Sequence, residues 1–277
     1  MEEELWEACF DGKVEEVRKL LQNEQINTNW QDPENSTTPF YNACLYGNIE
    51  IVKLLLNHQR LDINKADNDG FTPTYIACQN GHIEIVKLLL NDNRVDISKA
   101  NKNDATPFYI ACEKGHLEIV KLLNDHRVNI IKTMKNGATP FFIVCQKGYI
   151  EIVKLLLNDK RIDINQETND ATPFYIACQN GHIEIVKYML ACGREIDINK
   201  KFNNTKTPLD ISKERSAGLK FRNQTEKQFQ KAKRNCPKIV ELIESFQRNP
   251  IETREKLRKE LGLSGKNFLL TCLFIIC

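Results

Sequence analysis

A Thr-Pro pair recurs along the chain at nearly constant intervals, and this period constrains the fold more than any other feature. Successive pairs begin 33 to 35 residues apart, at Thr38, Thr72, Thr106, Thr139, Thr172 and Thr207. The sequence between them also repeats, and residues 75–87 and 175–187 are identical. A period of this length is typical of a stacked array whose units are too small to bury their apolar faces alone.

Each repeat predicts two short helices joined by a tight turn. Threonine at the N-cap accepts a hydrogen bond from a backbone N–H, and proline at the first helical position loses nothing by lacking one. The first helix of the third repeat is expected to end near Gly81, because glycine adopts the left-handed C-cap without strain. A second helix follows, with Ile83, Val86 and Leu89 at helical spacing. An extended finger then returns the chain to the next Thr-Pro.

These features resemble the ankyrin repeat over about residues 2–246. The matching residues are the Thr-Pro starts, the alanine of Ile-Ala-Cys, the Gly-His pairs at Gly81, Gly115 and Gly181, and Ile-Val-Lys-Leu-Leu. The resemblance implies an all-α ankyrin-repeat solenoid of about seven helix-turn-helix repeats, with short β-hairpin fingers and a helical C-terminal appendage.

The chain departs from the family directly after Thr-Pro, where the family usually has Leu-His. Phe-Tyr, Thr-Tyr or Phe-Phe stands there instead. The family's histidine supports the finger by hydrogen bonding, so we expect Tyr41, Tyr75, Tyr109 and Tyr175 to substitute for it in part. Phe142 has no polar group with which to do so.

The repeat pattern predicts four regions. Residues 1–32 form an amino-terminal capping repeat without Thr-Pro, and residues 33–201 form five ankyrin repeats. Residues 202–248 form an irregular closing repeat whose basic insertion precedes a second helix expected near Pro237. Residues 249–277 form a short charged helix and an apolar tail that starts at Phe268. We expect this tail to pack on the last helix as a cap, and a membrane-touching or aggregation-prone end is the alternative.

The cysteines indicate a reducing compartment. Cys44, Cys78, Cys112, Cys145 and Cys178 occupy the same position in successive repeats. Stacked helices lie roughly 8–10 Å apart, beyond the ~7 Å Cα separation that a disulfide allows. We therefore expect a column of buried thiols. The amino terminus is acidic and lacks an apolar signal core, which favours a cytoplasmic or nuclear location.

No motif predicts catalysis, and we expect a non-enzymatic protein with no cofactor and no metal site. His82, His116 and His182 recur with the repeat, so they are interpreted as structural. The segment from Gly262 to Lys266 is too short for a phosphate-binding loop.

The resemblance implies that the protein is a scaffold or adaptor that binds a protein partner through the concave face of the stack. Contact residues in the family lie at the finger tips and late on the first helix. In this chain those positions are Leu45, Tyr46, Asn68, Asp69, Phe71, Gln79, Asn80, Lys102, Asn103, Glu113, Lys114, Gln146, Lys147, Gln179 and Asn180.

Charge is unevenly distributed. Residues 200–277 carry 18 Lys and Arg against 8 Asp and Glu, while residues 1–199 are net acidic. The basic patch comprises Lys220, Arg222, Lys227, Lys231, Lys233 and Arg234. A solvated segment is the simplest interpretation. The functional alternatives for this segment are a nuclear localisation patch at Lys231 to Arg234, or contact with nucleic acid or an acidic membrane. For the repeat array, the alternative is the recognition arm of a larger assembly.

Overall fold

The computed structural model describes residues 1–124, 128–222 and 224–263. Two compact units are present, residues 1–140 and 141–277, and α9 (Pro140–Lys147) begins at their boundary. The apolar tail expected from Phe268 lies outside the described residues. The predicted division into four regions remains a prediction.

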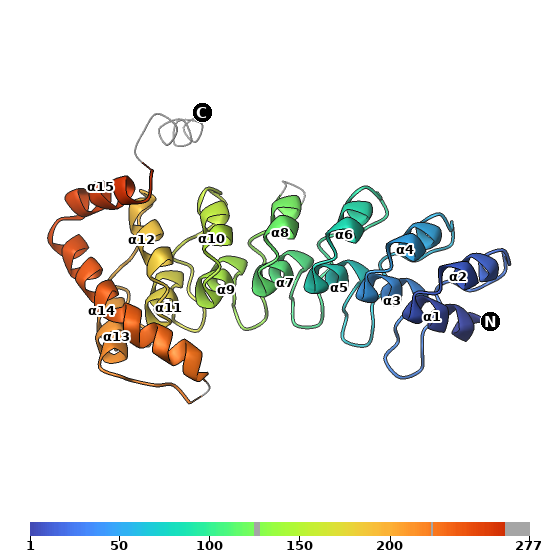
Figure 1. The fold of residues 1–277 in the computed structure, drawn as a ribbon, viewed down its shortest axis with the longest axis horizontal. Coiled ribbons are helices and arrows are strands. Elements are labelled where there is room, and N and C mark those ends of the chain that lie inside the picture. The colour runs from blue at the N-terminus through green and yellow to red at the C-terminus, as the bar shows by residue number, and fades with distance from the viewer. Residues whose placement is uncertain (125–127, 223, 264–277) are drawn as a thin grey trace. The chain divides into compact units, whose positions relative to one another are not determined.

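The first unit consists of helix pairs (Figure 1). Its first helices α1, α3, α5 and α7 pack side by side, and so do its second helices α2, α4, α6 and α8. Their bounds are α1 (Glu2–Asp11), α2 (Val14–Leu20), α3 (Pro39–Tyr46), α4 (Ile49–Leu56), α5 (Pro73–Asn80), α6 (Ile83–Leu90), α7 (Pro107–Lys114) and α8 (Leu117–Leu123).

The second unit continues the helix pairs and ends in an irregular closing repeat. The long helix α14 packs against α13, α12 and α11, and α15 packs against α12 and α14. The remaining bounds are α10 (Ile150–Leu157), α11 (Pro173–Gln179), α12 (Ile183–Ala191), α13 (Pro208–Ser216), α14 (Glu226–Arg248) and α15 (Pro250–Glu260).

The Thr-Pro pairs start the first helices as predicted. In α5, the Thr72 side chain accepts a hydrogen bond from the Tyr75 backbone N–H at 3.1 Å, and Pro73 is the first helical residue. Gly81 then adopts the left-handed C-cap with φ 79°. The six residues from Pro73 to Cys78 are all buried. The helix α5 is therefore almost wholly core, and only its last turn reaches solvent.

The fingers are tight turns, although short β-hairpins were expected. Among the described residues the only β-pairings are two isolated bridges, Thr168 with Ala171 and Phe202 with Lys206. One finger is closed by a hydrogen bond from the Asp67 N–H to the Phe71 carbonyl at 3.1 Å. Such a turn is too short for the repeated pairing that defines a strand.

The cysteine column is buried, as predicted. The thiols of Cys44, Cys78, Cys112, Cys145 and Cys178 are free and fully shielded. Burial disfavours the charged thiolate, which raises the pKa of each of these thiols. Cys9 and Cys236 extend the set of buried cysteines.

The basic insertion folds differently from the prediction. The second helix of the closing repeat was expected near Pro237, because proline often stands at a helix start. Instead, α14 begins at Glu226 and contains Pro237 in its interior. Its start is fixed by a capping box, in which Thr225 and Gln228 bond to each other's backbone N–H groups. A loop that includes residues 217–222 and 224–225 precedes it.

Candidate partner-binding surfaces

The last turns of several first helices are tied to the next repeat through a backbone carbonyl. The Leu45 carbonyl lies 3.0 Å from His82 Nε2 and accepts a hydrogen bond from Asn80 Nδ2 at 2.9 Å. His182 and Asn180 contact the Gln146 carbonyl in the same way, both at 3.0 Å. Carbonyls at a helix end lack partners within the helix, so these side chains supply them. These histidines therefore have a structural role, as the sequence predicted.

The finger tips of the first unit are linked by a backbone ladder. The N–H groups of Asn68, Lys102 and Lys135 donate to the carbonyls of Asn35, Asp69 and Asn103, at distances of 3.0 to 3.1 Å. The side chains of Asp69, Lys102 and Asn103 remain exposed. The ladder therefore holds a row of polar finger tips at fixed spacing.

The first two repeats present three aromatic side chains together. Trp6 stacks on Phe10 with ring centroids 5.6 Å apart, and Phe10 meets Tyr46 edge-on at 4.6 Å. Phe10 is 43% exposed and Tyr46 is 47% exposed. Trp6 is half-buried and donates from Nε1 to the Thr37 hydroxyl at 3.0 Å. We call Trp6, Phe10 and Tyr46 the aromatic patch.

The sequence interpretation named only Tyr46 of this patch. Trp6 and Phe10 lie one helical turn apart on α1, in the repeat without Thr-Pro. Their spacing of four residues places both rings on one helix face. This spacing could have predicted that the two rings lie together. It could not have predicted that α3 places Tyr46 against the same face of α1.

The other predicted contact residues differ in how far they reach solvent. Exposed side chains are those of Asn68, Asp69, Asn80, Lys102, Asn103, Lys114 and Lys147. Half-buried side chains are those of Leu45, Phe71, Gln79, Glu113, Gln146, Gln179 and Asn180. Phe71 stacks on Tyr75 with centroids 4.8 Å apart. Asn80 and Asn180 serve the helix-end carbonyls described above, which gives them a structural role.

In the first finger, Asp32 forms the internal contacts. Its carboxylate accepts hydrogen bonds from the Thr37 hydroxyl and N–H, both at 2.6 Å, and from the Asn35 N–H at 2.8 Å. Burial opposes ionisation of this carboxyl, but these hydrogen bonds outweigh it and lower the pKa of Asp32.

The Tyr41 hydroxyl donates to Asp67 Oδ2 at 2.9 Å in the next finger, as expected for a residue that replaces the family's histidine.

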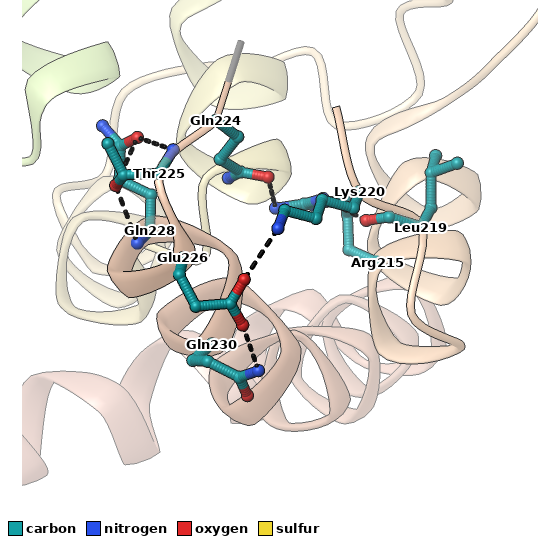
Figure 2. Close-up of polar contacts among 8 residues, drawn as sticks. All are labelled: Arg215, Leu219, Lys220, Gln224, Thr225, Glu226, Gln228 and Gln230. Atoms are coloured by element: carbon teal, nitrogen blue, oxygen red, sulfur yellow. Dashed lines mark hydrogen bonds and ion pairs between the residues drawn. The ribbon is translucent and has the colours of Figure 1, made fainter. Parts of the chain in front are cut away.

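Arg215 performs the histidine's role in the closing repeat. Its side chain is completely buried, and Nε donates to the Gln179 carbonyl at 3.1 Å. The guanidinium also donates to the Leu219 carbonyl and to Gln224 Oε1 (Figure 2). The rings of Phe221 and Phe229 lie 4.9 and 5.8 Å from its central carbon. Burial lowers the pKa of this guanidinium.

The residues of the basic patch lie in different surroundings, and Lys227 is exposed. Lys220 forms an ion pair with Glu226 at 2.7 Å, and Lys233 lies 6.0 Å from the centre of the Phe229 ring. Lys231 Nζ lies 3.0 Å from His182 Nδ1, while Arg222 and Arg234 are exposed. Burial and the charge of Lys231 lower the pKa of His182 to about 4.

Two kinds of feature are absent from the described residues. No helix there is both long and apolar enough to cross a membrane. No group of three or more His, Cys, Asp or Glu side chains is arranged there to hold a metal ion.

The family comparison covers most of the chain. A family model described as ankyrin repeats (3 copies) matches residues 5–101, 93–168 and 160–217. The comparison with curated proteins gave no significant match.

Proposed function

Because the chain belongs to the ankyrin-repeat family, whose repeats are generally protein–protein interaction modules, we propose that it is a protein-binding scaffold or adaptor. The family is typically non-enzymatic, and the proposed role requires no catalysis. Binding would use the last turns of the first helices and the finger tips, in the cytoplasm or nucleus.

One observation carries this proposal: the exposed aromatic patch on α1 and α3. Exposed aromatic rings that pack on one another supply a large contact area at a low cost in side-chain entropy. Aromatic residues are also enriched among the side chains that dominate binding energy at interfaces. Tyr46 was predicted as a contact residue from its position alone, and the structure adds Trp6 and Phe10 beside it.

The surrounding framework supports the proposal because it is held in place without a partner. Leu45, directly before Tyr46, has its carbonyl bound by Asn80 and His82. Trp6 is fixed by its hydrogen bond to Thr37. A surface whose side chains are already ordered loses little conformational entropy on binding.

Site-specific photo-crosslinking in cells tests the proposal. A photoreactive phenylalanine analogue replaces Tyr46 in the full chain, and a second variant carries it at Ile251, a control position on α15 that is 71% exposed. We expect defined protein cross-links from position 46 and none of the same size from position 251.

A second variant tests whether the patch supplies binding energy. Phe10→Ser combined with Tyr46→Ser should weaken capture of the cross-linked protein at least about tenfold, as expected when central aromatic contacts are lost. Ile251→Ser should leave capture unchanged. No cross-link from position 46, or equal cross-links from both positions, would contradict the proposal.

A further inference from the structure

A groove opens within the second unit where α14 meets the first helices. It has a volume of about 490 Å³ and is lined by Gln146, Lys147, Ile176, Gln179, Asn180, His182, Phe221, Gln224, Lys227, Gln228 and Lys231. These residues come from α9, α11, α14, the turn after α11 and the loop before α14. We call it the basic groove. Its volume lies within the range of ordinary ligand pockets.

The groove holds positive charge without a balancing carboxylate in its lining. Lys147, Lys227 and Lys231 contribute three ammonium groups, and no lining residue is acidic. Arg215 is buried nearby, held by carbonyl and amide oxygens and by aromatic rings. Glu226 is engaged by Lys220 and Gln230, at 2.7 and 2.6 Å (Figure 2). A concave site lined by charge of one sign concentrates counter-charged ligands.

One of these lysines is not explained by the stability of its own helix. Lys227 is the second residue of α14, where the helix dipole disfavours a cation. At this helix start Thr225 and Gln228 bond to each other's backbone N–H groups, as Figure 2 shows. Lys227 therefore does not stabilise the start of α14, whereas Lys147 lies in the last turn of α9, where the helix dipole favours a cation.

The rest of the lining favours a peptide over a nucleic acid. Gln146 and Gln179 line the groove, and both use their backbone carbonyls within the fold. An amide both donates and accepts, which matches the backbone of an extended peptide. Single-stranded nucleic acid would require free aromatic faces for stacking. The rings of Phe221 and Phe229 already lie against Arg215.

We propose that the basic groove binds an acidic, extended segment of the protein partner, whose carboxylates pair with Lys147, Lys227 and Lys231. This inference rests on the proposed protein-binding function and specifies the chemistry of the segment. The aromatic patch would supply apolar contacts, and the groove would select for negative charge.

Fluorescence anisotropy with the full chain at physiological salt tests the proposal. The probe is a fluorescein-labelled peptide of alternating Glu and Ser, and the matched peptide has Gln for Glu. We expect saturable binding of the Glu peptide alone. Lys147→Glu with Lys227→Glu should weaken it about tenfold or more, because each change replaces an attraction with a repulsion.

The matched control changes the same net charge outside the groove. Lys238→Glu with Lys256→Glu alters exposed lysines on α14 and α15 that do not line it. This variant should bind the Glu peptide within about twofold of the unaltered chain, since exposed charges more than a Debye length apart are largely screened. Equal weakening in both double variants would overturn the proposal, because it would indicate attraction by net charge alone.

Two other results would also overturn it. One is no binding of the Glu peptide, and the other is tighter binding of a single-stranded RNA or an anionic vesicle that also depends on Lys147 and Lys227. In either case, cross-linking from position 46 still tests the proposed protein-binding function independently. Loss of those cross-links with peptide binding retained would instead contradict the proposed use of the aromatic patch.

Discussion

Arg215 donates a hydrogen bond from Nε to the carbonyl of Gln179 at 3.1 Å, the same kind of carbonyl that histidines contact elsewhere in the chain. Arg215 lies on α13, the first helix of the following repeat, which ends at Ser216 and is not followed by a Gly-His pair. In this repeat the donor is therefore Arg215, which lies within α13 and has a longer side chain than histidine. Leu219, Phe221 and Gln224 of the loop that follows, and Phe229 of α14, contact the Arg215 side chain.

The first prediction concerns this contact. Arg215→Met keeps an apolar chain beside Phe221 but leaves the Gln179 carbonyl and Gln224 Oε1 without their donor. Buried acceptors left unpaired cost about 1–3 kcal/mol each, so we expect a loss of roughly 2–4 kcal/mol in the free energy of unfolding. Arg222→Met, at an exposed site on the following loop, should change it by less than about 0.5 kcal/mol. Urea denaturation followed by circular dichroism measures both, and an unchanged Arg215→Met variant would contradict the assignment.

The second prediction compares two glycines with positive φ. At Gly81, φ is +79°, and an added Cβ would lie 2.8 Å from Cε1 of His116. At Gly218, φ is +100°, and no heavy atom lies within 4 Å of such a Cβ. Gly81→Ala should therefore cost roughly 2–4 kcal/mol from backbone strain and the clash together.

Gly218→Ala serves as the control, because it should incur only the backbone strain of about 1 kcal/mol. The thermal unfolding midpoints of the two variants give the comparison. Equal losses would show that the imidazole moves aside freely, and that the contact does not restrict this position to glycine.

The third prediction is a dependence of stability on pH through His182. Burial and Lys231 lower its pKa from 6.5 to about 4, so the unfolded chain binds more protons between these values. Stability from this group is complete above pH 6.5 and falls as the pH is lowered towards 4. The loss at pH 5 should reach up to about 2 kcal/mol, since each unit of pH contributes about 1.4 kcal/mol.

His182→Asn provides the comparison, because Asn48 occupies the same position in the second repeat and donates to the Cys9 carbonyl at 2.9 Å. The variant should lose less stability than the unaltered chain between pH 7 and pH 5. Denaturation midpoints at several pH values measure this difference. Identical slopes for both proteins would refute the assignment of this titration to His182.

The fourth prediction concerns the cysteine column. Cys112→Ser places a hydroxyl in an apolar, fully buried site, with an expected cost of about 1–3 kcal/mol. Cys192→Ser is the control, because Cys192 is only half-buried and its Sγ donates to the Met189 carbonyl at 2.9 Å, a bond that serine can reproduce. Mass spectrometry after alkylation should find Cys112 unmodified in the folded chain. Burial raises its pKa, so little reactive thiolate is present.

Most of the repeat architecture could be predicted because its signals are local. The threonine caps, the glycine turns and the buried cysteines each depend on residues within one repeat, and each was found where the sequence placed it. Asp104 and Asp170 occupy the finger position that Gly70 and Gly137 occupy in other repeats, and both adopt positive φ, of 63° and 62°. The start of α14 was missed because Pro237 resembled a helix start, although Thr225 and Gln228 carried the correct capping signal.

The sequence by itself determined the period, the helix pairs and the apolar positions, since helix caps and burial patterns depend on near neighbours in the chain. The tertiary structure decided which side chains meet across helices. It brought Trp6 and Phe10 to Tyr46, and it buried Arg215 against the carbonyl of Gln179. It also set Lys147 of one helix and Lys227 of another around a single groove. Such contacts depend on how helices distant in sequence pack, and no short-range pattern in the chain encodes that packing.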